Sequence, residues 1–251
     1  MGEEGTVLAV IGDVHAHRAR LEAVLARVAE AAVDGILFVG DLGVDPFGRA
    51  LALWTGAGAR YHASIAAVLG RARALGVPVL YVPGNHDLPD LTETGNVDRG
   101  SAEIAGVRVA GIGGAGPGRF GFPYEWAEDE IRARVVPACD VLLCHAPPAR
   151  TPLDRLARGG RHVGSEALRE RALAHDGVLV CGHIHEAPGA VELGRCLCLN
   201  VGGLGEPYGR AQVGFVRRSP ALAGGFEVVH EDLESGLVRR WSRGAAGERV
   251  P

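Results

Sequence analysis

The sequence predicts an α/β fold in which helices pack in layers around two β-sheets, and three observations support this prediction. Apolar runs typical of buried strands alternate with segments of helical periodicity as far as residue 181. Beyond residue 181, short strand-like runs follow one another through glycine-rich turns. The length of 251 residues suits one α/β fold, because such folds often exceed the usual ~150 residues per domain. We therefore expect residues 1–251 to form a single domain.

The individual elements follow from their apolar patterns. Residues 6–11 are continuously apolar, as expected for a strand buried on both faces. Further strands are expected at residues 35–39, 77–82, 107–112, 140–144, 177–181, 190–193, 196–201, 212–217 and 226–231. Helices are expected around residues 21–28, 65–72, 125–135 and 165–175. Ser165 is a suitable N-cap for the last of these helices.

Polar side chains follow five of the predicted strands, at the point where each strand ends. They are Asp13 and His15, Asp41, Asn85 and His86, His145, and His183 and His185. Ligands of open α/β sheets bind outside the carboxyl ends of the strands, so these side chains are expected to meet at one edge. The glycines that precede four of these five groups allow sharp turns and close approach there.

Each of these residues also has a structural interpretation when it is taken alone. A Gly-Asp pair after a strand commonly forms a turn, and a single histidine is commonly a packed or surface side chain. We interpret five other histidines in this ordinary way: His17, His62, His162, His175 and His230. The strand-end residues are interpreted as a site, because five short motifs in order at five strand ends would be an improbable coincidence.

The ordered motifs carry a family resemblance. They are Gly12-Asp13-Val14-His15, Gly40-Asp41, Gly84-Asn85-His86-Asp87, His145 and Gly182-His183-Ile184-His185. As a set they resemble the calcineurin-like metallophosphoesterase superfamily over most of the chain. The resemblance implies a four-layer α/β/β/α sandwich with two mixed β-sheets. It also implies a phosphoester hydrolase that uses two metal ions.

The resemblance further implies a role for each strand-end residue. Asp13, His15 and His185 would bind one metal ion. Asn85, His145 and His183 would bind the other, and Asp41 would bridge the two. His86 would be the catalytic residue that acts on the leaving group, and Asn85 would also contact the substrate.

The chemistry of these residue types agrees with that implied role. Imidazole together with carboxylate suits divalent Mn, Fe, Zn or Ni, and we favour Mn, with two ions per chain. Metal binding lowers the pKa of water from 15.7 toward ~7, so a metal-bridging hydroxide could attack the phosphorus at neutral pH. The departing alkoxide would then need a proton, which His86 could supply.

Departures from the superfamily pattern bear on the substrate. Protein phosphatases of this superfamily carry an arginine after the second motif and another after the third, and both arginines are missing here. Val44 stands where the carboxylate partner of the catalytic histidine is expected, and Asp45 and Asp87 are the alternatives. These departures argue against a phosphoprotein substrate.

Three further segments resemble the small prokaryotic phosphodiesterase-like branch. They are His145-Ala146-Pro147-Pro148, Arg161-His162-Val163-Gly164-Ser165 and Gly182-His183-Ile184-His185-Glu186. They favour a small phosphorylated substrate whose phosphodiester bond is hydrolysed. Such a substrate would be a nucleotide-like compound or a cyclic nucleotide. The alternatives are a phosphomonoesterase of a small metabolite and a metal-binding scaffold without catalysis. The sequence does not identify the oligomeric state.

Composition excludes several other classes of protein. A formal charge of -4 argues against general nucleic-acid binding. No apolar run reaches the ~18 residues of a membrane span, and the acidic N-terminus does not resemble a secretory signal. The five cysteines form no disulfide framework and are expected to pack as reduced thiols in a cytoplasmic protein.

One further motif is a competing signal. Residues 111–116 match the dinucleotide fingerprint G-x-G-x-x-G and follow a predicted strand. Pro117 and Gly118 come next where the fingerprint requires a helix, so we interpret the segment as a loop near the metal edge.

Overall fold

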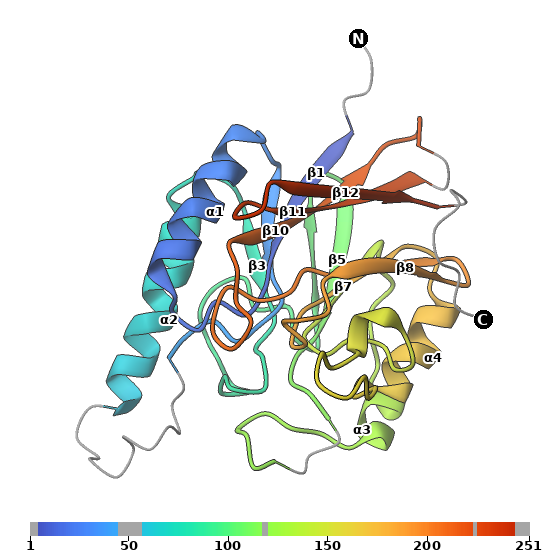
Figure 1. Cartoon of the computed structure of the whole chain (residues 1–251), viewed down its shortest axis with the longest axis horizontal. Helices are drawn as coiled ribbons and strands as arrows, with labels where there is room; N and C mark the ends of the chain where they lie inside the picture. The colour runs from blue at the N-terminus through green and yellow to red at the C-terminus, as the bar shows by residue number, and fades with distance from the viewer. Residues whose placement is uncertain (1–4, 45–56, 117–119, 223–224, 244–251) are drawn as a thin grey trace.

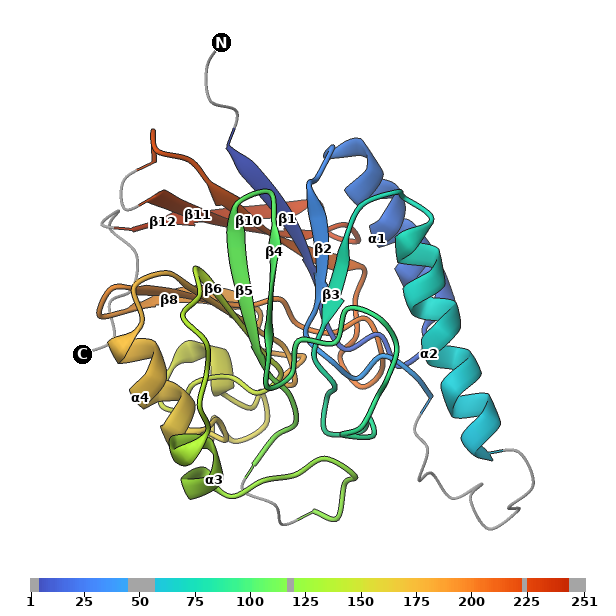
Figure 2. The ribbon, with the colours of Figure 1, turned by 180° about the vertical axis from the view of Figure 1, so that it is seen from behind.

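The computed structural model describes residues 5–44, 57–116, 120–222 and 225–243. Two six-stranded sheets pack face to face, and helices cover the outer face of each (Figures 1 and 2). Helices α1 (Arg18–Glu30) and α2 (Ala57–Arg73) cover the first sheet. Helices α3 (Glu128–Ala133) and α4 (Glu166–Ala174) cover the second. The predicted four-layer α/β/β/α sandwich is confirmed.

The first sheet has the strand order β12-β11-β10-β1-β2-β3. Its strands are β1 (Thr6–Ile11), β2 (Gly35–Phe38), β3 (Val79–Tyr81), β10 (Gln212–Arg218), β11 (Phe226–Asp232) and β12 (Leu237–Ser242). Strands β1, β2 and β3 run parallel, whereas β10, β11 and β12 pair antiparallel. The sheet is therefore mixed, as predicted.

The second sheet has the order β4-β5-β6-β7-β9-β8 and is also mixed. Its strands are β4 (Ser101–Ile104), β5 (Val107–Ile112), β6 (Val141–Cys144), β7 (Val178–Cys181), β8 (Gly189–Leu193) and β9 (Cys196–Asn200). Strands β5, β6, β7 and β9 are parallel, and β4 and β8 flank them antiparallel. A short 3-10 helix, η2 (Pro152–Asp154), follows β6.

Alternation along the strands explains why both faces of each sheet are buried. In β1, Ala9 and Ile11 pack toward α1 and α2, while Leu8 and Val10 pack toward the other sheet. Successive side chains of a strand point to opposite faces, so a continuously apolar strand fills both layers. Cys144, Cys181, Cys196 and Cys198 are buried in the layer beneath α3 and α4. The prediction that cysteines serve as core side chains is confirmed for these four.

Two strands were not predicted as elements of their own. Strand β4 forms a tight hairpin with β5 around Ala105 and Gly106, both at positive φ. Strand β12 lies at the edge of the first sheet and leaves Leu237 and Val238 half exposed. Its apolar residues therefore do not follow the pattern of a buried strand. Within the described residues, no helix combines the length and apolar character that crossing a membrane requires.

The layer between the two sheets yields a stability prediction. Leu199 is fully buried there, in β9, whereas Leu237 is 49% exposed in β12. We expect Leu199→Ala to lower the free energy of unfolding by about 2–5 kcal/mol, because it removes apolar contacts and leaves a cavity. The matched Leu237→Ala should cost less than about 1 kcal/mol. Urea denaturation of both variants measures the difference, and equal losses would contradict the contribution of this layer.

Candidate metal centre

The strand ends converge on one edge of the molecule, as the sequence predicts. The turns after β1, β2 and β7 hold non-glycine residues at positive φ: Asp13 (40°), His15 (44°), Asp41 (49°) and His183 (64°). Such backbone is uncommon outside glycine and concentrates at functional sites. The turns thus aim side chains from both sheets at a common point.

Two motif glycines make room for the carboxylates. A Cβ atom at Gly84 would fall on the Asp41 carboxylate, and a Cβ atom at Gly182 would fall on the Asp13 carboxylate. Any larger residue at these positions would displace a carboxylate. Both glycines are therefore required for close approach of backbone and side chain.

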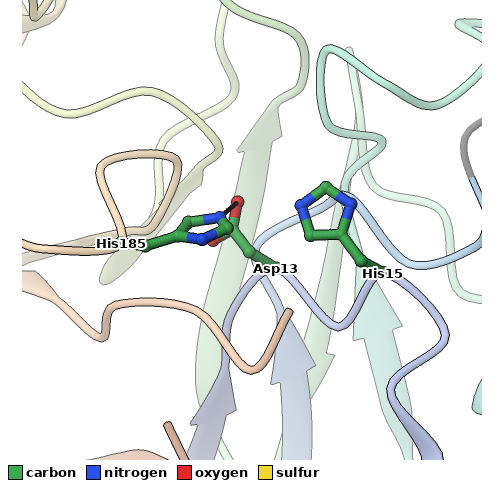
Figure 3. Close-up of side chains that lie close together, drawn as sticks. All are labelled: Asp13, His15 and His185. Carbon is green, nitrogen blue, oxygen red and sulfur yellow. Dashed lines mark ion pairs between the residues drawn. The ribbon is translucent and has the colours of Figure 1, made fainter. Parts of the chain in front are cut away.

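The first group of candidate ligands consists of Asp13, His15 and His185 (Figure 3). Nε2 of His185 lies 3.3 Å from Oδ1 of Asp13, and its Nδ1 donates a hydrogen bond to the carbonyl oxygen of Pro207 at 2.8 Å. The rings of His15 and His185 are 5.4 Å apart. The carbonyl oxygen fixes the ring of His185 so that Nε2 faces the site.

The second group consists of Asp13, Asp41 and His145. Nδ1 of His145 donates to the carbonyl oxygen of Val39 at 2.8 Å. Nε2 of His145 faces Oδ1 of Asn85 at 2.8 Å. A carbonyl only accepts hydrogen bonds, so Nδ1 carries a proton and Nε2 is the nitrogen left for a ligand role. Two facing acceptors at this distance repel unless a proton or a cation lies between them.

Asp41 lies between the two groups. Its Oδ2 atom is 3.6 Å from Nε2 of His15 and 3.6 Å from Nε2 of His145. Its Oδ1 atom accepts a hydrogen bond from the backbone of His86 at 2.8 Å. The ring of His183 is 4.9 Å from that of His145. The structure thus brings all the predicted metal ligands together.

Burial and charge set the protonation of these groups. Burial alone would raise the pKa values of Asp13 and Asp41, but the neighbouring histidines outweigh it and hold both pKa values below their usual range. Burial, together with the charge of His145, lowers the pKa of His183 to about 3. Burial also lowers the pKa of His15. Ionised carboxylates and neutral imidazoles are the forms that bind metal ions.

The pKa of His185 is shifted in the opposite direction to those of His15 and His183. Burial lowers its pKa, but the Asp13 carboxylate more than offsets this effect and raises the pKa to about 9. The buried Oδ1 atom of Asp13 accepts no well-aligned hydrogen bond from the described residues, and its nearest charged neighbour is Nε2 of His185 at 3.3 Å. A divalent cation at this place would satisfy that oxygen and replace the proton on His185. The donor set therefore fits a divalent metal centre.

A cavity of about 360 Å³ opens over these groups. It is lined by His15, Asp41, Asn85, His86, Phe122, His183, His185, Glu186, Glu206 and Pro207. The His86 ring packs against that of Phe122, with centroids 4.2 Å apart. Sequence reasoning did not assign site positions to Phe122, Glu186, Glu206 or Pro207. Phe122, Glu206 and Pro207 lie on loops whose sequences carry no pattern that places them at the metal edge, whereas Glu186 directly follows the last of the predicted motifs.

Asp87 has a structural role in the site. Its buried carboxylate accepts hydrogen bonds from the backbone N–H groups of Leu42 and Gly84 and from the hydroxyl group of Tyr61. It thereby ties the turn after β2 to the turn after β3. Burial and the charge of Asp41 raise the pKa of Asp87 to about 6. Asp45, the other carboxylate considered as a partner for His86, lies outside the described residues.

Comparison with known proteins agrees with the fold. A model of the calcineurin-like phosphoesterase family matches residues 6–187. The chain therefore belongs to the calcineurin-like phosphoesterase family. Uncharacterized protein MJ1162 of Methanocaldococcus jannaschii is 31% identical over 136 residues, which make up 49% of this chain and 62% of that protein. The match thus spans less than two thirds of that relative.

Solved structures share the fold at low sequence identity. The structure of TT1561 of Thermus thermophilus has a TM-score of 0.57 and 15% identity, and the match covers 95% of this chain and 99% of that one. A dimetal phosphatase from Danio rerio has a TM-score of 0.60 and 12% identity, with 94% and 98% covered. At these identities the likeness establishes the shared architecture.

The raised pKa of His185 predicts a pH dependence of metal binding. In metal-free protein His185 is protonated below its pKa of about 9, and a metal ion at Nε2 requires the neutral ring. Mn²⁺ binding at pH 8 should therefore release a proton. The affinity should rise from pH 7 to pH 9, by up to about tenfold per pH unit. Titration calorimetry in buffers of different ionisation enthalpy measures both effects.

A matched substitution checks the source of that proton. His62 is a half-exposed histidine outside the cavity, so His62→Asn should leave the proton release unchanged. His185→Asn should remove the release and weaken Mn²⁺ binding. A Mn²⁺ affinity that is flat between pH 7 and pH 9 would contradict the role assigned to His185.

Proposed function

We propose that this protein is a two-metal phosphoesterase that prefers phosphodiesters to phosphomonoesters. The observation that carries the preference is the charge of the cavity lining. Glu186 and Glu206 line the cavity over the metal ligands, and the described lining residues include no arginine. A dianionic monoester would have to enter beside these two carboxylates. A monoanionic diester meets less repulsion there.

The balance of charge around the cavity refines this argument. Glu206 is 68% exposed and pairs with Arg20 at 2.9 Å, so solvent and that guanidinium weaken its effect. Glu186 is less exposed and lies directly after the metal-ligand motif. Its Oε1 atom accepts a 3.4 Å hydrogen bond from the backbone of Ala157. We therefore assign the larger part of the discrimination to Glu186.

The metal centre follows the same proposal. Asp13, His15 and His185 would hold one ion, Asn85, His145 and His183 would hold the other, and Asp41 would be shared by both. The position of Oδ2 of Asp41, at equal distances from His15 and His145, supports this assignment. Bound divalent ions, with Mn favoured, would stabilise the phosphoryl oxygens and lower the pKa of water toward neutrality. The free cysteines suit a reducing, cytoplasmic environment.

His86 acts on the leaving group in this proposal. Its backbone is fixed on Oδ1 of Asp41, and its ring is held against Phe122 at the wall of the cavity. Asn85, the preceding residue, presents its side chain to His145. Consecutive residues therefore serve different partners, and we assign to His86 the donation of a proton to the departing oxygen.

The proposed substrate class has a direct test. Protein reconstituted with Mn²⁺ should bind two ions per chain, and it should hydrolyse bis-p-nitrophenyl phosphate with a higher kcat/KM than p-nitrophenyl phosphate. Both substrates release p-nitrophenolate, so the comparison isolates the charge and the second ester group. Glu186→Gln should narrow the difference by improving the monoester. A monoester preference in the fully loaded protein would overturn the proposal and favour a phosphomonoesterase.

A second prediction separates His86 from the metal ligands. If His86 protonates the leaving oxygen, His86→Ala should lower kcat by roughly 10²–10⁴-fold for alkyl esters. The loss should be smaller for p-nitrophenyl esters, because p-nitrophenolate is stable as an anion. Rates measured across leaving groups of rising pKa should therefore fall more steeply in the variant.

The metal content of the variant decides how that result is interpreted. His86→Ala should retain two ions per chain by elemental analysis, as should the control variant His62→Ala. A variant that loses metal would show that His86 supports the metal centre. Equal slowing for all leaving groups would likewise exclude proton donation.

A further inference from the structure

A second, larger cavity lies beside the metal centre. Its volume is about 750 Å³, and it is formed by η2, the loop that follows η2, and the segment from Glu186 to Pro188. Glu186 lines this cavity and also the cavity over the metal ligands. The short segment from His183 to Pro188 therefore connects a metal-ligand motif to the wall of a second binding space.

The walls of this second cavity carry hydrogen-bonding groups held in fixed positions. Asp154 is fully buried and accepts hydrogen bonds from the backbone of Arg150, Thr151 and Gly164 and from Nδ1 of His162. The distance from His162 Nδ1 to Asp154 Oδ1 is 2.6 Å, while 45% of the His162 side chain remains exposed. A buried carboxylate thus orients a histidine whose other nitrogen is left for a further partner.

Arg155 places a positively charged guanidinium group on the same wall. Within the described part of the chain its guanidinium makes no ion pair, although it lies against the backbone of Gly160. Arg150, by contrast, pairs with Glu166 at 2.7 Å. The cavity therefore offers donors on Arg155 and an acceptor on Glu186, with opposite charges that nearly cancel. This balance suits an uncharged polar group rather than a second phosphate.

We propose that this cavity binds a nucleoside group esterified to the phosphate of the substrate. The inference rests on the proposed function, because the phosphate itself would lie at the metal centre. Hydroxyl groups and base edges present both donors and acceptors, which match Arg155, His162 and Glu186. The volume is within the roughly 300–1,000 Å³ of small-molecule sites, so a nucleoside fits.

The test compares two diesters with the same leaving group. Thymidine 5′-(p-nitrophenyl phosphate) carries a nucleoside, whereas bis-p-nitrophenyl phosphate does not. Arg155→Ala should raise the KM of the thymidine ester about tenfold with little change in kcat, because it removes a charged hydrogen-bond donor. The KM of bis-p-nitrophenyl phosphate should remain unchanged. Arg158→Ala is the matched control, since Arg158 is exposed in the same loop but does not line the cavity.

A binding measurement makes the test independent of activity. Thymidine alone, titrated into metal-free protein, should shift the NMR signals of His162, and Arg155→Ala should weaken this binding about tenfold. His162→Ala keeps the three backbone hydrogen bonds to Asp154, so it should fold and should also bind thymidine weakly. Equal thymidine binding by wild type, Arg155→Ala and His162→Ala, or no binding by the wild type, would overturn the inference. Loss of hydrolysis of both diesters with thymidine binding intact would instead count against the proposed function.

Discussion

The site depends on two buried carboxylates, Asp13 and Asp41, which are almost inaccessible to solvent. A buried charge is costly unless it is paired and hydrogen-bonded. Oδ2 of Asp13, after β1 of the first sheet, accepts from the backbone of His183, after β7 of the second. Oδ1 of Asp41 accepts from the backbone of His86. These bonds hold strand ends from both sheets at one point, so satisfying the carboxylates also assembles the site.

The same constraint explains the turns around the site. Asp13, Asp41 and His183 adopt positive φ because their side chains and backbone groups must reach one another across the gap between the sheets. This backbone costs of order 1–3 kcal/mol per residue, and the hydrogen bonds to the carboxylates offset it. The negative charge of Asp41 also raises the pKa of nearby Asp87, which backbone donors from two turns help to keep ionised. Hydrogen bonds within the same few turns therefore offset both the cost of the positive-φ backbone and the cost of the buried carboxylates.

The sequence predicted the parts of the molecule that strong local patterns encode. Continuously apolar strands such as 6–11 have only one stable environment, a sheet buried on both faces, and the polar residues that follow them meet at one edge. The order of the strands, such as the pairing of β1 with β10, depends on contacts between distant segments, for which a single sequence gives no periodic signal. Phe122 and Glu206 reach the cavity from loops for the same reason. The support that Asp87 gives to two turns was missed because a buried hydrogen-bond acceptor resembles any other aspartate in a sequence.

Strand ends and loops carry different parts of the site. The candidate metal ligands lie at the ends of strands, where two packed sheets fix them, and the proposed two-metal reaction would need such fixed positions. The groups assigned to substrate recognition lie on loops, which can change length and residue type without disturbing the sheets. Glu186 joins the two regions, since it follows the last metal-ligand motif and lines both cavities. Under the proposed function, a change in the loop after η2 should alter which ester group is bound and leave the candidate metal ligands in place.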